Sequence, residues 1–147
     1  MCQVLQLLAV LCATLFAGAA LYISVVEHPA RLTLDTRAAV RQWAPSYTRA
    51  TWLQAPAALL SFASGAAAWL VGAGAGWFVA ALLIGVVVPF TFVVVMPTNH
   101  ELLAPGRDLD AAEMRMLLRR WGHLHAVRTV LSVASTALYF WLLRDLQ

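Results

Sequence analysis

The sequence predicts an all-α integral membrane protein, a bundle of four membrane-spanning helices. Of its 147 residues, 62% are hydrophobic and 12% are charged, and the mean hydropathy is +0.77. Soluble domains carry about 25% charged residues, so the composition excludes that class. Four apolar runs each approach the ~20 residues that a membrane-crossing helix needs. They cover residues 4–26, 51–71, 77–96 and 127–143, and we expect residues 1–147 to form one four-span domain. The runs do not alternate with period two, which excludes a transmembrane β-barrel.

The first run has the hydropathy of a secretory signal but lacks its basic leader. No Lys or Arg precedes it, although small residues occur at 17–20. Signal peptides begin with a positively charged region, so we expect this run to be retained as the first span. Cys2 and Cys12, the two cysteines of the chain, both lie in it. They cannot by themselves build a disulfide framework or a thiolate metal site.

The connection between the first and second spans is predicted to hold a short interfacial helix. Pro29 is expected to end the first span, because proline removes a helical hydrogen bond. Asp35 is a favourable N-cap for a helix that reaches Trp43, and Pro45 is expected to interrupt that helix. Tyr47 marks the membrane interface, where aromatic side chains are enriched.

The connection between the third and fourth spans is predicted to hold a second interfacial helix. Asp110 followed three residues later by Glu113 matches a capping box. We expect the helix that it opens to continue into the fourth span. Residues 72–76, which alternate Gly and Ala, join the second and third spans. So short a connection forces an antiparallel hairpin.

The basic residues predict the orientation of the bundle. All ten are Arg, which we attribute to the codon usage of a GC-rich bacterial genome. Arg144 lies on one side, and eight lie in or beside the two long connections; the eight are Arg31, Arg37, Arg41, Arg49, Arg107, Arg115, Arg119 and Arg120. The positive-inside rule places these connections in the cytoplasm and both termini outside. We expect a multi-pass protein of the inner (cytoplasmic) membrane, with Arg side chains facing anionic headgroups and not nucleic acid.

The fourth run carries a stripe of polar side chains on a helix that is otherwise apolar. His125 and Arg128 lie three residues apart, and Trp121 lies one turn before them. The stripe continues inward through Ser132 and Tyr139. A charged side chain at the centre of a membrane helix costs ~2.5–3.5 kcal/mol on insertion scales. An intramembrane polar site is therefore the first functional hypothesis.

Polar residues of the other three spans end similar inward stripes on the same side of the membrane. They are Glu27, Gln54 and Asn99, which an antiparallel four-span topology brings to the end of the bundle that holds His125 and Arg128. Helical bundles keep ligand and cofactor sites in such places. The alternative is that Glu27 and Arg128 form a buried ion pair that only fixes the helix arrangement.

Histidines on this side make a metal site worth considering, because imidazole and carboxylate together suit Zn, Cu or Fe. His123 and His125 are two residues apart and face nearly opposite sides of a regular helix. The candidate metal ligands are therefore Glu27, His28 and His125. The cofactor expectation is a transition metal, Cu or Fe, or none. A proton-transfer or substrate-binding role for His125 is the alternative.

Three motifs, EHPAR at 27–31, MPTN at 96–99 and WGHLHAVR at 121–128, resemble the anthrone-oxygenase-like family, small four-span membrane proteins long filed as a domain of unknown function. The resemblance covers essentially the whole chain. It implies a four-helix membrane bundle. For the members with an assigned role, it implies oxidation of an anthrone to an anthraquinone with O2.

Such a reaction needs a base, a cation for the enolate oxygen and an apolar cavity. His125 or Glu27 would be the base, with Arg128 and Asn99 stabilising the oxyanion. A bound redox metal would replace this scheme with metal-centred O2 chemistry. The other candidate substrate contacts are Gln54, Trp121, Ser132 and Tyr139.

The function expected is a membrane-embedded oxidoreductase, of the O2-dependent oxidase or monooxygenase kind, acting on a hydrophobic substrate. A small-molecule carrier or binding subunit and a structural or assembly protein are the alternatives. The sequence contains no Gly-rich nucleotide loop and no Ser nucleophile motif, which disfavours nucleotide-dependent and hydrolytic chemistry. The expected partners are the lipid bilayer and a hydrophobic small molecule, with a homo-oligomer left open.

Overall fold

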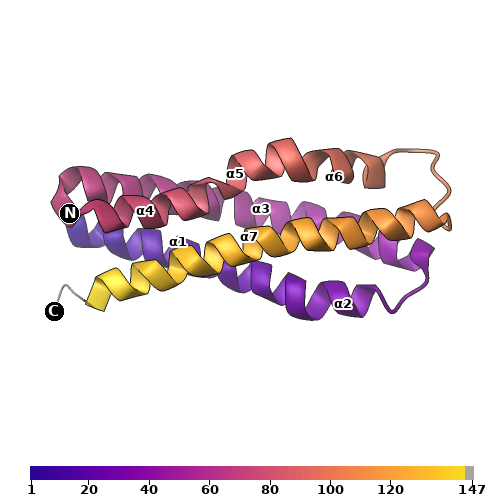
Figure 1. The fold of residues 1–147 in the computed structure, drawn as a ribbon, viewed down its shortest axis with the longest axis horizontal. Helices are drawn as coiled ribbons and strands as arrows, with labels where there is room; N and C mark the ends of the chain where they lie inside the picture. Colours follow the sequence, from indigo (N-terminus) through magenta and orange to yellow (C-terminus); the bar gives the residue numbers. More distant parts are fainter. Residues whose placement is uncertain (145–147) are drawn as a thin grey trace.

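The computed structural model describes residues 1–144 and folds them into four antiparallel helical spans packed side by side (Figure 1). Each span is long and apolar enough to cross a membrane; the four are Cys2–Arg31, Thr36–Ala73, Ala75–Leu103 and Ala112–Arg144. No strand occurs in this part of the chain. The predicted all-α four-helix bundle is confirmed.

The first span passes through a proline without ending there. It consists of α1 (Cys2–Tyr22), the π-helical turn η1 (Ile23–Glu27) and α2 (His28–Arg31). Proline lacks an N–H, and its ring clashes with the carbonyl four residues earlier. The wider π turn before Pro29 accommodates the ring, so the chain stays helical. The expectation that Pro29 ends the span is therefore wrong.

The second span is also longer than predicted. It consists of α3 (Thr36–Ala68) and the turn η2 (Trp69–Ala73). Its start is as predicted, because the Asp35 side chain accepts a hydrogen bond of 2.8 Å from a first-turn amide. The predicted interruption at Pro45 is absent. Trp43 is completely buried in the bundle, and such tertiary packing stabilises a helix more than local propensity does.

The hairpin between the second and third spans is confirmed. Gly72 and Gly74 both have φ +96°, a left-handed conformation that glycine adopts without the steric cost of a side chain. The chain reverses there and enters the third span at Ala75.

The third span is divided into pieces by its prolines. The pieces are α4 (Ala75–Gly85), α5 (Val87–Phe90), the π turn η3 (Thr91–Val95) and α6 (Met96–Leu103). The break at Val86 comes shortly before Pro89, and η3 comes shortly before Pro97, as expected where proline disturbs the helical hydrogen bonds. Figure 1 shows the span stepping outward at α5.

The fourth span is a single helix, α7 (Ala112–Arg144), of 33 residues. At 1.5 Å per residue it is ~50 Å long, which exceeds the ~30 Å hydrocarbon core. The predicted continuation of the connecting helix into the span is confirmed. The predicted capping box is not formed at Asp110, because α7 begins two residues later. The Asp110 carboxylate instead accepts a 3.0 Å hydrogen bond from Arg37 Nε, which lowers the pKa of Asp110.

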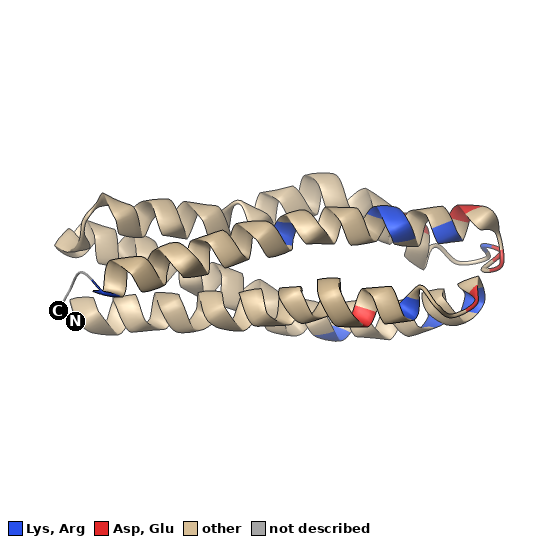
Figure 2. Ribbon diagram, turned by 60° about the horizontal axis from the view of Figure 1, so that its bottom comes forward, with Lys and Arg blue, Asp and Glu red and all other residues tan. Residues whose placement is uncertain are grey.

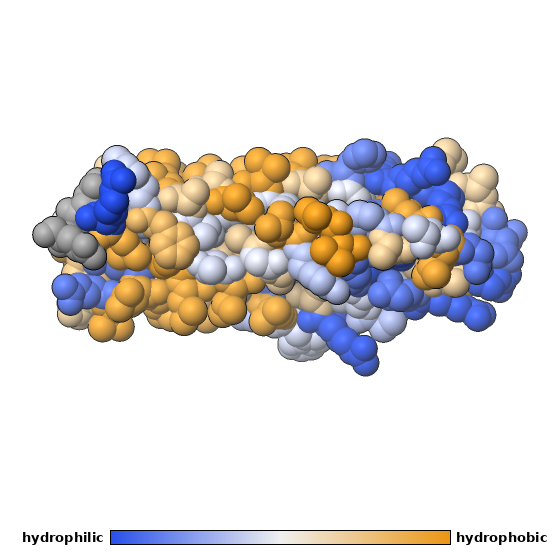
Figure 3. Space-filling view, turned by 90° about the horizontal axis from the view of Figure 1, so that it is seen from below, coloured by the Kyte–Doolittle hydropathy of each residue, from blue (hydrophilic) through white to orange (hydrophobic). Residues whose placement is uncertain are grey.

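Charged residues gather at one end of the bundle. Figure 2 shows them at the end that holds the two long connections, opposite the start of α1 and the end of α7. Figure 3 shows the same division on one face, where hydrophobic side chains cover most of the remaining length. This asymmetry supports a multi-pass membrane protein whose polar end lies at one membrane face.

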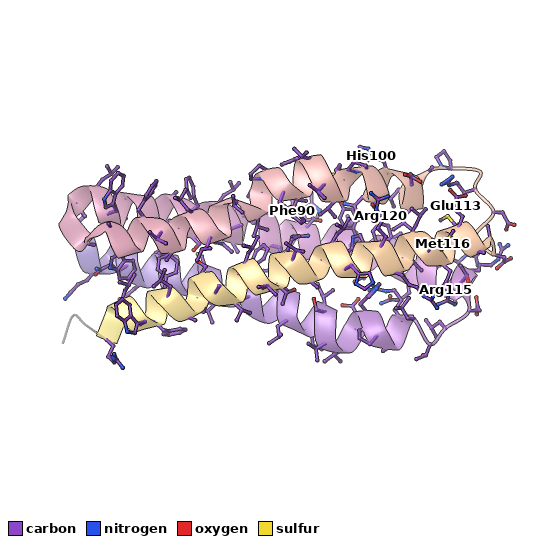
Figure 4. All side chains as sticks on the ribbon, viewed as in Figure 1. Phe90, His100, Glu113, Arg115, Met116 and Arg120 are labelled. Atoms are coloured by element: carbon purple, nitrogen blue, oxygen red, sulfur yellow. The ribbon has the colours of Figure 1, made fainter. Side chains whose placement is uncertain are left out.

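Arg115 of α7 ties the charged end together (Figure 4). Its guanidinium donates to the carbonyls of Leu32 and Leu34 at 3.1 and 2.6 Å, and to the Thr36 hydroxyl at 3.2 Å. These bonds hold the turn between α2 and α3 against α7.

Three apolar cores follow one another along the bundle. The core at the charged end contains Trp43, Leu118 and Trp121, and the middle core contains Phe16 and Ile84. The core at the opposite end is built around residues of the termini and the hairpin. The polar residues described next lie where the first and middle cores meet.

The orientation of the bundle can be tested by cysteine labelling in a variant with Cys2→Ala and Cys12→Ala. Met116→Cys places a thiol at the charged end, where Met116 is 62% exposed, and Ala75→Cys places one at the hairpin. If the positive-inside rule holds, an impermeant maleimide added to spheroplasts labels the Ala75→Cys variant, and labels Met116→Cys only after permeabilisation. The opposite pattern would mean an inverted bundle.

Candidate functional site

The centre of the candidate site is Arg128, a buried cation without a carboxylate partner. Only 9% of the residue is exposed. Its Nη2 donates a 2.8 Å hydrogen bond to Gln54 Oε1 on α3, and its Cζ lies 5.5 Å from the centre of the Phe16 ring on α1. Among residues 1–144, no Asp or Glu lies within ion-pair distance of it. Among the described residues, the contacts of the charge are an amide oxygen and an aromatic face, and neither carries a formal negative charge.

One turn before Arg128, His125 forms part of an aromatic stack. Its ring lies parallel to Trp121, with centroids 4.9 Å apart and an interplanar angle of 8°. Trp43 of α3 meets Trp121 edge-on at 5.7 Å, and the His28 ring is tilted against Trp121 with centroids 5.2 Å apart. The spacing of four residues places Trp121 and His125 on the same face of α7, so the stack fixes the imidazole plane.

Gly122 makes the approach of His28 possible. A Cβ atom at Gly122 would lie 2.6 Å from His28 Cδ2 and would also overlap His28 Nε2. Real Cβ contacts of this length are essentially absent, so any side chain here displaces the imidazole or α7 itself.

Glu27 belongs to a separate polar group beside the stack. Its carboxylate forms an ion pair with Arg31, one helical turn away, and accepts hydrogen bonds from Gln42 and Ser46. The Arg31 guanidinium lies 5.9 Å from the centre of the Trp121 ring. The alternative ion pair between Glu27 and Arg128 is therefore not formed, since Arg31 takes the carboxylate.

A small polar cavity lies between these groups. Its lining comes from η1, α2, α3 and α7, and the polar and aromatic members are Arg31, Trp43, Ser46, Tyr47, Thr51, Gln54, Trp121, His125 and Arg128. The space that the centre of a water molecule can occupy in this cavity has a volume of about 10 Å³. That is close to the space that one water needs.

The lining of the polar cavity is rich in unpaired hydrogen-bond donors. Six buried side-chain nitrogens of lining residues have no hydrogen-bond partner among residues 1–144; they are Trp43 Nε1, Gln54 Nε2, Trp121 Nε1, His125 Nδ1, His125 Nε2 and Arg128 Nε. His125 interacts with the Ala20 carbonyl without reaching hydrogen-bond geometry. Indole and guanidinium N–H groups can only donate, so the cavity suits an acceptor.

A larger apolar cavity adjoins the polar one. By the same measure its volume is about 90 Å³. Tyr47, Thr51, Gln54 and Arg128 line both cavities, and the remaining lining residues are Phe16, Ala55, Ala58, Val87, Val88, Thr91, Phe92 and Met96. The two cavities therefore meet at Gln54 and Arg128.

The family model described as anthrone oxygenase matches residues 43–138, a range that contains Gln54, Asn99, His125 and Arg128. This chain belongs to the anthrone oxygenase family. A curated relative, anthrone oxygenase tpcL from Aspergillus fumigatus, is 29% identical over 145 residues, covering 90% of this chain and 89% of the relative. No solved structure matches the chain.

Four of the residues predicted from the sequence come together in this member of the anthrone oxygenase family. Gln54, Trp121, His125 and Arg128 all line the polar cavity. Glu27 does not line it and is separated from it by Arg31.

The other predicted contacts lie outside the two cavities. Asn99 is completely buried, and its Nδ2 lies 3.9 Å from Met96 Sδ, the sulfur that Tyr47 Oη also approaches at 3.9 Å. Ser132 donates to the Thr129 carbonyl, while Tyr139 donates to a carbonyl of α3 and packs in the core near the termini. The hydroxyls of Ser132 and Tyr139 are therefore satisfied by backbone carbonyls, and their burial does not require a bound substrate.

A metal centre has no support in the geometry. No group of three or more His, Cys, Asp or Glu side chains that could hold a metal ion occurs among residues 1–144. The set of Glu27, His28 and His125 therefore stays a sequence prediction. His100 and His123 are exposed, and Figure 4 shows His100 directed away from the other helices.

Sequence reasoning missed several residues of the polar cavity. The polar and aromatic lining residues that were not candidates are Arg31, Trp43, Ser46, Tyr47 and Thr51. Trp43, Tyr47 and Thr51 are spaced by four and therefore share one face of a helix. This spacing was the available signal, but it is meaningful only if α3 continues through Pro45.

Substitution Gly122→Ala tests the aromatic stack. The added methyl displaces the His28 imidazole, which we expect to lower stability by about 1–3 kcal/mol, as overpacking does, and to reduce the near-ultraviolet circular dichroism of the tryptophans. Gly18→Ala is the matched control, because a Cβ at Gly18 meets no atom within 4 Å. An unchanged aromatic spectrum and thermal midpoint for Gly122→Ala would contradict the described contact.

Proposed function

We propose that the protein is a membrane-embedded oxidoreductase that uses O2 to oxidise a hydrophobic aromatic ketone with an acidic C–H, an anthrone being the model substrate. The family and the name of the relative support the reaction class. The single observation that carries the proposal is the donor-rich polar cavity around Arg128, which suits a negatively charged oxygen. We place this cavity toward the cytoplasmic membrane face, where the charged end of the bundle would lie.

The cavity offers donors where the reaction develops negative charge. Removing a proton from an anthrone moves an electron pair onto the carbonyl oxygen. Arg128 Nη2 donates a 2.8 Å hydrogen bond to Gln54 Oε1. Because Gln54 uses its oxygen for Arg128, its NH₂ group is left to donate. Preorganised donors in a site without bulk water stabilise an oxyanion strongly, because charge interactions grow as the dielectric constant falls.

His125 is the base in this proposal. In its neutral form the imidazole has a free nitrogen lone pair, and both ring nitrogens are without a hydrogen-bond partner. The ring therefore does not have to break a hydrogen bond to accept the proton. Stacking on Trp121 holds its plane. Glu27, the other candidate base, is bound by Arg31, Gln42 and Ser46.

The remaining steps balance without further reactants. The enolate carbon gives electrons to O2 and forms a C–O bond, and the peroxide oxygen takes up a proton. Loss of water from the hydroperoxide gives the quinone. One substrate molecule and one O2 thus yield one quinone and one water, and the chain's part is to take up and return protons and to hold the oxyanion.

Replacement of His125 tests the base. We expect His125→Ala to lower the rate of oxygen uptake with anthrone by about 10²–10⁴-fold, the usual contribution of a general base, while the protein stays folded because no buried charge loses its partner. His123→Ala is the matched control, since His123 is an exposed histidine on the same helix. Rates are measured in detergent and corrected for spontaneous oxidation of the anthrone. A His125→Ala protein with the rate of the His123→Ala control would exclude His125 from the chemistry.

Replacement of Arg128 tests the oxyanion site. Loss of one oxyanion donor typically lowers kcat about 10²–10³-fold, so we expect the kcat of Arg128→Met to fall by that factor. Arg128→Lys should recover part of the rate, because lysine keeps the positive charge. Wild-type protein that binds an anthrone without consuming O2 would favour the carrier or binding-subunit reading. Equal rates for Arg128→Met and wild type would remove Arg128 from the proposal.

A further inference from the structure

We infer that the substrate reaches the site sideways from the hydrocarbon of the bilayer, through the apolar cavity between α3 and the α5–η3 segment, with its oxygen leading. This inference rests on the proposed function for the chemistry of the ligand, a flat apolar molecule with one polar oxygen. The route itself rests on the cavities.

The apolar cavity runs from the lipid-facing surface to the buried cation. Its outer lining includes Thr51, Ala55 and Phe92, all exposed, and Phe92 is 64% exposed. Its inner lining includes Gln54 and Arg128, which are buried. No Asp or Glu lines the apolar cavity. A molecule that enters between these exposed residues therefore meets apolar walls first and hydrogen-bond donors last.

The volumes fix the orientation of the ligand. The polar cavity admits about 10 Å³ and the apolar cavity about 90 Å³, both measured at the centre of a water molecule. Only a group of water size, such as one oxygen substituent, fits the polar cavity. The rings must remain in the apolar cavity, so the oxygen points at Gln54 and Arg128.

The mouth of the apolar cavity, between α3 and the α5–η3 segment, follows from the local sequence of both segments. The third span is broken at Val86 and again by the π turn η3, and Figure 1 shows it stepping outward there. On the facing side, the part of α3 that follows Gln54 lines the cavity with the small residues Ala55 and Ala58.

A second groove on the other side of α3 is a poorer route for an apolar molecule. It is wide and open, and its lining includes Glu27, Arg49 and Ser46 together with Tyr22 and Ala19. An apolar ring would have to pass an ion-paired carboxylate and an arginine there. This groove suits water and protons.

A matched pair of substitutions tests the route. Ala55→Phe fills the mouth of the apolar cavity, and Ala19→Phe makes the same change in the opposite groove. The probe is 9,10-anthraquinone, and its binding to the protein in nanodiscs is measured by quenching of tryptophan fluorescence. We expect Ala55→Phe to weaken binding roughly tenfold or more, as overpacking of a cavity does, and Ala19→Phe to bind like wild type. Phe92→Ala, which widens the mouth, should bind at least as well as wild type.

The binding readout separates this inference from the proposed function. If wild-type protein binds the quinone but does not oxidise anthrone, the proposed oxidation fails while the route is still tested by the variants. Far-ultraviolet circular dichroism and thermal midpoints establish that each variant is folded. We expect both phenylalanine variants to fold, because each added ring faces lipid or an open groove. Binding by Ala55→Phe that equals wild type, or equal losses in Ala55→Phe and Ala19→Phe, would overturn the lateral route.

Discussion

The arrangement of the bundle depends on a positive charge that the fold buries without an ion-pair partner among residues 1–144. Arg128 is held by the oxygen of Gln54 and lies over the ring of Phe16. Removing a cation from water is costly unless it is paired, and an amide with an aromatic face compensates only in part. Three helices must therefore meet at this point, α1 with Phe16, α3 with Gln54 and α7 with Arg128, and the cavities lie where they meet.

The aromatic residues around this charge keep the site preorganised. Trp121 stacks on His125 and contacts the rings of His28 and Trp43, and the absence of a side chain at Gly122 leaves room for His28. Each ring is fixed by the next, so the imidazole does not depend on a hydrogen bond for its position. An imidazole that is positioned by stacking leaves its ring nitrogens without hydrogen-bond partners among the described residues.

The parts of the structure that the sequence predicts are those set by composition and local periodicity. Four apolar runs, the glycine hairpin and the polar stripe of α7 required no tertiary information, and they already brought Gln54, His125 and Arg128 together. The errors come from tertiary packing. Pro45 reads as a helix break, yet burial of Trp43 keeps α3 continuous. This error hid the face that carries Tyr47 and Thr51.

Glu27 shows that the polar cluster is not held together by an ion pair with Arg128. A purely structural ion pair would use the Glu27 carboxylate to neutralise Arg128, and the sequence places both residues toward the same end of the bundle. In the fold, Arg31 takes that carboxylate together with Ser46 and Gln42, and the Arg31 guanidinium then lines the polar cavity beside Trp121. Neutralising Glu27 in this way keeps its negative charge away from Arg128. An oxygen that acquires charge during a reaction then meets an unneutralised cation, and a bundle optimised only for stability would gain nothing from leaving Arg128 in that state.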